Sequence, residues 1–345
     1  MTLFRPRPAS ARSPVPRAPR RGLRAGLAAA GLALLAACAG PDAPSDARLP
    51  EGTRVVELPS GRALDGLPAL AARAREADLL VVGEVHDNPS HQELQVVLAR
   101  TLGIRALALE MVPQAAEPAL AELRAAAPDP ETRAAPETES LRAAADWDDY
   151  APWHGVIEAV PQAQVTGGGV PRADLRQAMT EGAAAAFGAD AARYGLDAPL
   201  PAGEQGALEA ELDASHCGAL PAEMLAPMVE AQRLRDARFA QALLRARQGA
   251  GAGAGASAGP ARAMLVTGNG HARRDRGAPF VLTFAAPELR VLSILQAEWS
   301  PDAPGDVAAA LAPWRRADGG LPYDLAVIAP APGREDPCAR FRKQG

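Results

Sequence analysis

Four short polar signatures in this chain each follow directly on an apolar run. The runs are four to six residues long, and stretches of helical composition separate them. They occupy residues 79–82, 104–109, 163–166 and 264–267. Short apolar runs of this kind, bounded by glycine or an acid, are typical of buried parallel strands. The predicted fold class is therefore α/β, with a mainly parallel sheet flanked by helices.

Chemically active side chains follow three of these predicted strands. Glu84 and His86 come after the first, Glu110 after the second and His271 after the fourth. Because ligands bind beyond the carboxyl ends of the strands in open parallel sheets, we expect these four side chains to meet at one edge. A buried carboxylate such as Glu110 costs several kcal/mol unless it is paired or protonated, so it needs a partner, and either histidine would serve.

Two roles suit this group, and the spacing does not choose between them. His86, His271 and Glu110 could hold a divalent metal ion. The same residues with Glu84 could instead form a metal-free acid–base set that activates water for hydrolysis. Whether the chain is an enzyme is left open at this point.

Residues 1–37 are predicted to be a signal peptide that precedes Cys38. They contain seven arginines, no acid and an apolar stretch at 27–37, which is too short to span a membrane in the mature protein. The sequence Leu35-Ala36-Ala37-Cys38 resembles a bacterial lipobox, and the resemblance implies lipidation of Cys38 and a membrane anchor facing the periplasm. Ala39 favours the outer membrane. The alternative is an ordinary signal peptide.

Loss of the leader makes the mature chain strongly acidic. The leader contains seven of the 36 basic residues. The mature chain therefore has 29 basic and 41 acidic residues, and its net charge is −12. Such a charge argues against nucleic-acid binding, which depends on neutralising phosphates. Cys217 and Cys338 would lie in an oxidising compartment, where a disulfide and two buried thiols are both open.

Composition divides the mature chain into a core, an insertion and linkers. Residues 222–247 are the longest predicted helix, residues 90–102 are a helix capped by Ser90, and residues 128–139 are predicted to be an exposed loop. The predicted divisions are a flexible tether at 38–52, a discontinuous α/β core at 53–138 and 261–335 with a strand near 163–168, a mostly helical subdomain at 139–248, and a Gly/Ala-rich flexible insertion at 249–260.

At the site residues the chain resembles a known family, the ChaN-like haem-binding uptake lipoproteins. The block Gly83-Glu84-Val85-His86-Asp87-Asn88-Pro89 is similar to the family's opening motif, and residues 268–279 are similar to its closing one. The resemblance implies a parallel α/β core with a smaller helical domain and a role in haem or iron acquisition. More distantly, the chain resembles the erythromycin esterases and the TraB/Tiki hydrolases, which share the paired Gly-x-x-His and acidic positions.

The resemblance also implies haem ligation by a tyrosine at a homodimer interface. Tyr150 is the predicted phenolate ligand, with His154 close by in the sequence; the alternative is that the aromatic residues here close an interface between domains. Arg273 is the predicted clamp for a propionate or substrate carboxylate, or else the ion-pair partner of Asp275. The predicted function is thus a lipid-anchored protein that binds haem or another iron compound, and the alternative is a hydrolase.

Overall fold

The computed structural model describes residues 48–336 except 59, 145–150 and 253–260, together with residues 338 and 339. All of them fall in one compact unit. The predicted division of this unit into an α/β core and a helical subdomain stays a prediction. None of the helices in the described part combines the length and the apolar composition of a transmembrane span.

A single eight-stranded sheet runs through this unit in the order β2-β1-β8-β7-β3-β6-β4-β5. Neighbouring strands from β8 to β5 are parallel, whereas β1 pairs antiparallel with both β8 and β2. The predicted, mainly parallel α/β class is confirmed. The strands are β1 (Arg54–Glu57), β2 (Arg62–Leu64), β3 (Leu79–Glu84), β4 (Ala106–Pro113), β5 (Gln164–Gly169), β6 (Ala263–Gly268), β7 (Val291–Glu298) and β8 (Leu325–Ala329).

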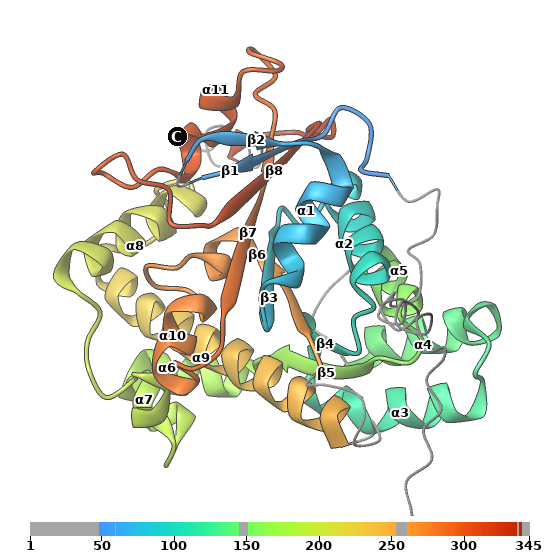
Figure 1. Ribbon diagram of the computed structural model, residues 1–345. Helices are drawn as coiled ribbons and strands as arrows, with labels where there is room; N and C mark the ends of the chain where they lie inside the picture. The colour runs from blue at the N-terminus through green and yellow to red at the C-terminus, as the bar shows by residue number, and fades with distance from the viewer. Residues whose placement is uncertain (1–47, 59, 145–150, 253–260, 337, 340–345) are drawn as a thin grey trace, which may run out of the picture. The chain divides into compact units, whose positions relative to one another are not determined.

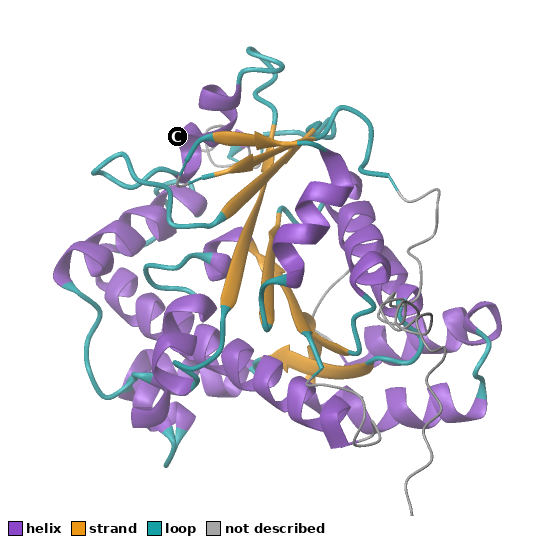
Figure 2. Cartoon of the chain, viewed as in Figure 1, coloured by secondary structure: helices purple, strands orange, loops and turns teal. Residues whose placement is uncertain are grey.

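Helices cover both faces of the sheet (Figures 1 and 2). Helices α1, α2 and α5 share a core with one face, and α6, α7, α9 and α10 share a core with the other. The helices are α1 (Gly66–Arg75), α2 (Pro89–Leu102), α3 (Glu117–Ala126), α4 (Pro130–Ala144), α5 (Ala151–Ala159), α6 (Arg172–Glu181), α7 (Ala183–Phe187), α8 (Ala202–Ser215), α9 (Ala222–Ala252), α10 (Ala278–Ala285) and α11 (Val307–Leu311).

The apolar character of the central strands follows from this two-sided cover. Successive side chains of a strand point to opposite faces. In β3, Leu79 and Val81 enter the core under α9, while Leu80 and Val82 enter the core under α2. Every residue of β3 is buried, so no position favours a polar side chain until the strand ends at Glu84.

Three local predictions differ from the structure. The cap of α2 is Asn88 rather than Ser90, because the Asn88 side chain accepts a hydrogen bond from the Ser90 N–H at 2.9 Å and Pro89 occupies the first helical position. Residues predicted as the loop 128–139 belong largely to α4. The predicted insertion at 249–260 is helical at its start, since α9 extends to Ala252, and residues 253–260 lie outside the described part.

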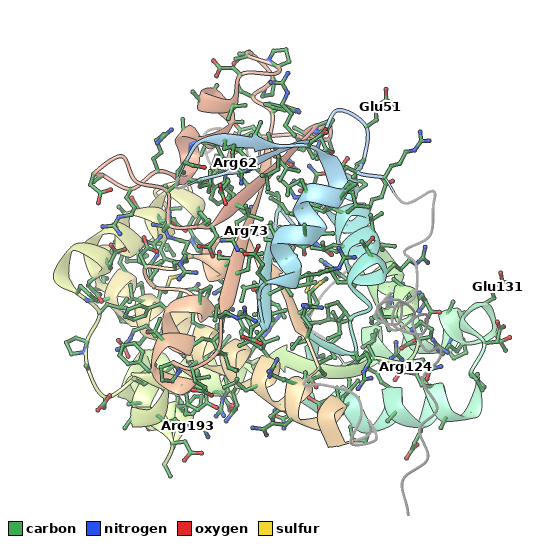
Figure 3. All side chains as sticks on the ribbon, in the orientation of Figure 1. Glu51, Arg62, Arg73, Arg124, Glu131 and Arg193 are labelled. Carbon is green, nitrogen blue, oxygen red and sulfur yellow. A yellow bond between two sulfur atoms is a disulfide. The ribbon has the colours of Figure 1, made fainter. Side chains whose placement is uncertain are left out.

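The antiparallel edge of the sheet carries charge. Arg62 and Arg73, labelled in Figure 3, both contact Glu57, with nitrogen–oxygen distances of 3.1 Å and 3.4 Å. Strands β1 and β2 escape sequence prediction because they are short and their outer residues are polar. Charged side chains on an edge strand hinder pairing with another chain.

The C-terminal segment is fixed at two points. Arg334 bridges Asp87, in the turn after β3, and Glu298, at the end of β7, with nitrogen–oxygen distances of 2.6 Å to each. Farther on, Cys338 forms a disulfide with Cys217, just after α8. The question of pairing that the sequence left open is thus resolved in favour of a disulfide.

Candidate functional site

The site arises because β6 inserts between β3 and β4. Consecutive strands of the chain would otherwise be neighbours, but β6 arrives after β5 and pairs with β3 on one side and β4 on the other. Glu84 lies beside Gly268 in this register. The carboxyl ends of the three strands therefore bring Glu84, Glu110 and the turn that carries His271 to one edge, where α/β sheets bind ligands.

Glu84 and His86 form the first carboxylate–imidazole pair. His86 Nδ1 lies 2.8 Å from Glu84 Oε1, and the carboxylate is completely buried. Two more donors reach it, Trp153 Nε1 at 2.7 Å and Gln95 Nε2 at 2.5 Å. With both oxygens occupied, Glu84 is held rigidly and in turn orients the imidazole.

Helix α2 supports this turn from behind. His91 Nδ1 accepts a hydrogen bond from the Val85 N–H at 3.0 Å, and its Nε2 lies 3.3 Å from the Ala297 carbonyl oxygen. Burial lowers the pKa of His91, which suits a neutral ring that accepts at one nitrogen and donates at the other. The four-residue spacing of His91 and Gln95 places both against the turn after β3.

His271 and Asp236 form the second pair. His271 Nδ1 lies 2.7 Å from Asp236 Oδ1, and the two side chains are 15% and 6% exposed. Asp236 comes from α9, which packs against the sheet, and the Phe239 ring one turn along meets the imidazole edge-on at 4.9 Å. His271 is therefore held from a helix distant in sequence and not from its own turn.

Glu110 lies between the two histidines. Its Oε2 accepts hydrogen bonds from the Thr267 hydroxyl at 2.6 Å and from the Gly268 N–H at 2.8 Å. Its Oε1 lies 3.9 Å from His271 Nε2. Gly268 leaves room here, because a Cβ at this position would lie 3.1 Å from His86 Nε2 and the imidazole would have to shift. The missing side chain lets His86 approach the end of β6.

Charge within the site raises the pKa of both imidazoles and lowers that of Glu110. Burial opposes the charged form of His86, but the hydrogen bond to Glu84 and the charge of Glu110 raise its pKa overall. Burial likewise opposes protonation of His271, and Asp236 and Glu110 outweigh it, so its pKa is also raised. Burial would raise the pKa of Glu110, yet the two histidines and its hydrogen bonds lower it.

A cavity of about 440 Å³ opens over these residues. His86, Glu110, Asp236 and His271 line one part of it. Leu208 and Leu212 from α8 give it an apolar wall, and the remaining lining residues are Glu211, Ser215, Gln232, Arg235, Gly268, Gly270 and Arg276. The volume lies in the range of small-molecule pockets.

The other predicted ligand-binding residues lie elsewhere or outside the described part. Cys38 and Tyr150 both fall outside it. His154 belongs to α5, where its Nε2 lies 3.5 Å from Glu137 and 3.7 Å from Glu158. These three residues are also a group whose ligand atoms all lie within 4.8 Å of one another.

Arg273 is bound by its neighbour. Its guanidinium contacts both carboxylate oxygens of Asp275, at 2.9 Å and 2.6 Å, and the side chain is 6% exposed. It is not among the residues that line the cavity. Of the two roles open from the sequence, the structure places Arg273 in the ion pair.

Sequence reasoning missed several members of the site. Asp236 and Arg235 lie in the middle of a long helix, where no local pattern distinguishes them from surface residues. Trp153, three residues after Tyr150 in the sequence, donates a hydrogen bond to Glu84. Two signals were available for the helix residues: residues 232–236 resemble a later block of the family's motifs, and Gln232, Arg235 and Asp236 lie three and four residues apart and so share a helix face.

The fold and the geometry together define a class: α/β proteins with two carboxylate–imidazole pairs at the carboxyl edge of a parallel sheet, both imidazoles lining one cavity. The family model described as haem-binding uptake, Tiki superfamily, ChaN matches residues 70–282, and the chain belongs to this family. This membership confirms the resemblance drawn from the motifs. A comparison with curated proteins gives no match.

A solved structure shows the same fold at low sequence identity. The chain is similar to ChaN of Campylobacter jejuni, whose structure is described as cofacial haem binding, with a TM-score of 0.55 and 16% identity over 80% of this chain and 96% of that one. Weaker matches are the type III effector HopBA1 (TM-score 0.39, 15% identity, 76% and 93% covered) and a mutant of the erythromycin esterase EreC (0.37, 13%, 78% and 94%).

Proposed function

We propose that this chain binds haem as a cargo for iron uptake. Family membership supports the ligand class. The observation within the molecule that carries the proposal is the position of His86, whose side chain is 35% exposed and lines the cavity at the carboxyl edge of the sheet.

Two residues are candidates for the axial ligand of the iron. Histidine nitrogen is a common axial ligand of haem iron, and because Nδ1 of His86 pairs with Glu84, a bond from this residue to the iron would use Nε2. Leu208 and Leu212, the apolar side chains in the cavity lining, are 8% and 5% exposed. Tyr150, a phenolate candidate outside the described residues, is the competing ligand. When bound, haem supplies the iron, and the chain supplies binding and orientation.

A haemin titration followed in the visible spectrum tests this proposal. The purified chain is expected to give a saturable Soret shift at about one haem per chain. His86→Gln and Tyr150→Phe are compared, and the variant that abolishes the shift identifies the ligand. His216→Gln serves as the control, because His216 hydrogen-bonds to the Leu212 carbonyl oxygen and does not line the cavity. A titration without saturation would exclude haem as the cargo.

A second candidate function, hydrolysis, is favoured by a specific observation. Both histidines bind a carboxylate through Nδ1, which is the arrangement that fixes the tautomer of a general base and stabilises it once protonated. His271 Nε2 could take a proton from water while Asp236 holds the ring. If the chain is a hydrolase, Glu84→Gln and Asp236→Asn should remove turnover of an ester substrate. If it binds haem, the same two variants should leave the Soret shift largely intact.

The location proposed for this chain is a lipid anchor at Cys38, facing the periplasm, with the outer membrane preferred. The basic and apolar leader supports it, and so does the Cys217–Cys338 disulfide, since such bonds persist in oxidising compartments. Cell fractionation tests it: the chain should sediment with membranes, and Cys38→Ser should move it to the soluble fraction. Unchanged sedimentation of the variant would contradict lipidation.

A further inference from the structure

One wall of the cavity is a helix that buries little apolar surface. Helix α8 contributes four residues to the lining, including Leu208 and Leu212. Among the α8 side chains that the structure describes, these two leucines alone are buried. They pack with Leu200 and Val229 in a small cluster that is separate from the two large cores on the faces of the sheet. We therefore expect α8 to open locally more easily than the strands behind it.

Ion pairs and a disulfide hold α8 in place. Glu204 and Glu211 of this helix both contact Arg276, and the distance from Glu204 is 3.5 Å. Just beyond the helix, Cys217 forms the disulfide with Cys338. Cys217 has a φ of 61°, in the left-handed region that glycine usually occupies after the end of a helix. The backbone at this position thus favours glycine, and the covalent tie is what the cysteine contributes.

The other end of this tie is fixed beside the first carboxylate–imidazole pair. Cys338 follows Arg334 by four residues, and Arg334 forms ion pairs with Asp87 and Glu298. Asp87 is the residue next to His86 in the chain, and His86 lines the cavity. The disulfide therefore joins the α8 wall of the cavity to a segment that is itself bound to the turn carrying His86.

We propose that the disulfide between Cys217 and Cys338 is a redox-sensitive latch that keeps α8 closed over the cavity. A dithiol reductant opens it by thiol–disulfide exchange: the reductant gives two electrons and two protons, both cysteines become thiols, and the reductant becomes a disulfide. Both cysteines are only half-buried, which leaves part of each residue exposed to a reductant. With the bond broken, the small apolar cluster and the ion pairs alone hold α8, and the cavity opens along this helix. The latch is independent of which ligand the cavity binds.

Amide hydrogen exchange of the purified chain, with and without dithiothreitol, tests the latch. After reduction the amides of residues 204–215 should exchange about tenfold faster, because α8 opens more often, whereas the amides of β3 and β6 should keep their rates. Cys338→Ser should give the same increase without reductant. The matched control is Ala219→Ser, which adds a hydroxyl group at an exposed position after α8 and leaves the disulfide intact. It should exchange like the unaltered chain.

Labelling with diethyl pyrocarbonate, which modifies accessible imidazoles, shows whether this opening reaches the cavity. The side chain of His271 is 15% exposed and lines the cavity, so it should be labelled several-fold faster after reduction. His91, which is 1% exposed and does not line the cavity, should be labelled at an unchanged rate. The latch is overturned if reduction leaves exchange in α8 unchanged, or if exchange rises there without faster labelling of His271. Equal acceleration of exchange throughout the chain would also overturn it, because the disulfide would then stabilise the whole fold and not α8 in particular.

Discussion

The two carboxylate–imidazole pairs share one chemistry but are built in different ways. Glu84 and His86 are two residues apart, at the end of β3 and in the turn that follows. Asp236 and His271 are 35 residues apart and come from different elements. Both pairs have nearly the same nitrogen–oxygen distance, 2.8 Å and 2.7 Å. In the first pair the turn after β3 brings the two groups together. In the second pair the packing of α9 against the sheet does so.

Exposure separates the pairs further. The His86 side chain is 35% exposed and that of His271 only 15%. Glu84 accepts hydrogen bonds from Trp153 and Gln95 as well, while burial raises the pKa of Asp236 and its histidine only partly offsets this. In the first pair a rigidly held acid is combined with an accessible imidazole. In the second pair both side chains are largely buried. This contrast is the reason why we propose His86, and not His271, as the residue that contacts the ligand.

The largest effect is expected from removing the anchor of the first pair. Glu84→Ala leaves three donors without their acceptor, and two of them, on Trp153 and Gln95, are buried. We therefore expect the free energy of unfolding to fall by about 3–5 kcal/mol. Urea denaturation measures this. Asp236→Ala removes fewer contacts and should cost less, about 1–3 kcal/mol. Glu93→Ala, an exposed acid on α2, is the control and should stay within about 0.5 kcal/mol. If Glu84→Ala and Asp236→Ala lowered the free energy of unfolding equally, the first pair would not be held more firmly than the second.

A smaller and more selective effect is expected from Asp236→Asn. Loss of the negative charge should lower the pKa of His271 and leave that of His86 unchanged, which NMR titration of the ring protons can follow. In the unaltered chain the pKa of His271 is raised above 6.5, so its contribution to stability is complete below about pH 6.5 and is lost as the pH rises through the folded-state value. In the variant that loss should occur at lower pH. A parallel shift of His86 would show that the pairs are coupled.

Most of the fold was predictable because it depends on short-range patterns. Strands that are buried on both faces require continuous apolar runs. Glu84 at the end of β3 and Glu110 in the carboxyl half of β4 interrupt these runs and mark the carboxyl edge of the sheet. Glu84, His86, Glu110 and His271 were therefore predictable as a group. The partner of His271 was not, because Asp236 reaches it only after α9 packs across the sheet.

Polar composition misled the prediction for α4. Its prolines, glutamates and threonine are typical of an exposed loop, but Arg133 and Glu137 are buried and lie 3.3 Å apart. Arg124 of α3, labelled in Figure 3, also contacts Glu137, and His154 lies against the same carboxylate. Glu137 has its pKa lowered to about 2, since His154, Glu158 and Arg124 together outweigh burial. A buried charge network of this kind depends on tertiary contacts that no sequence window contains.

The disulfide closes a loop that contains one carboxylate–imidazole pair and leaves the other pair outside it. Cys217 and Cys338 are 121 residues apart, and the covalent loop between them contains the whole second pair, while Glu84 and His86 precede it. A protease that cuts one peptide bond inside this loop would produce no separate fragment, because the disulfide keeps both pieces joined. A single cut between the two pairs, before Cys217, would divide the chain into two fragments with one pair on each.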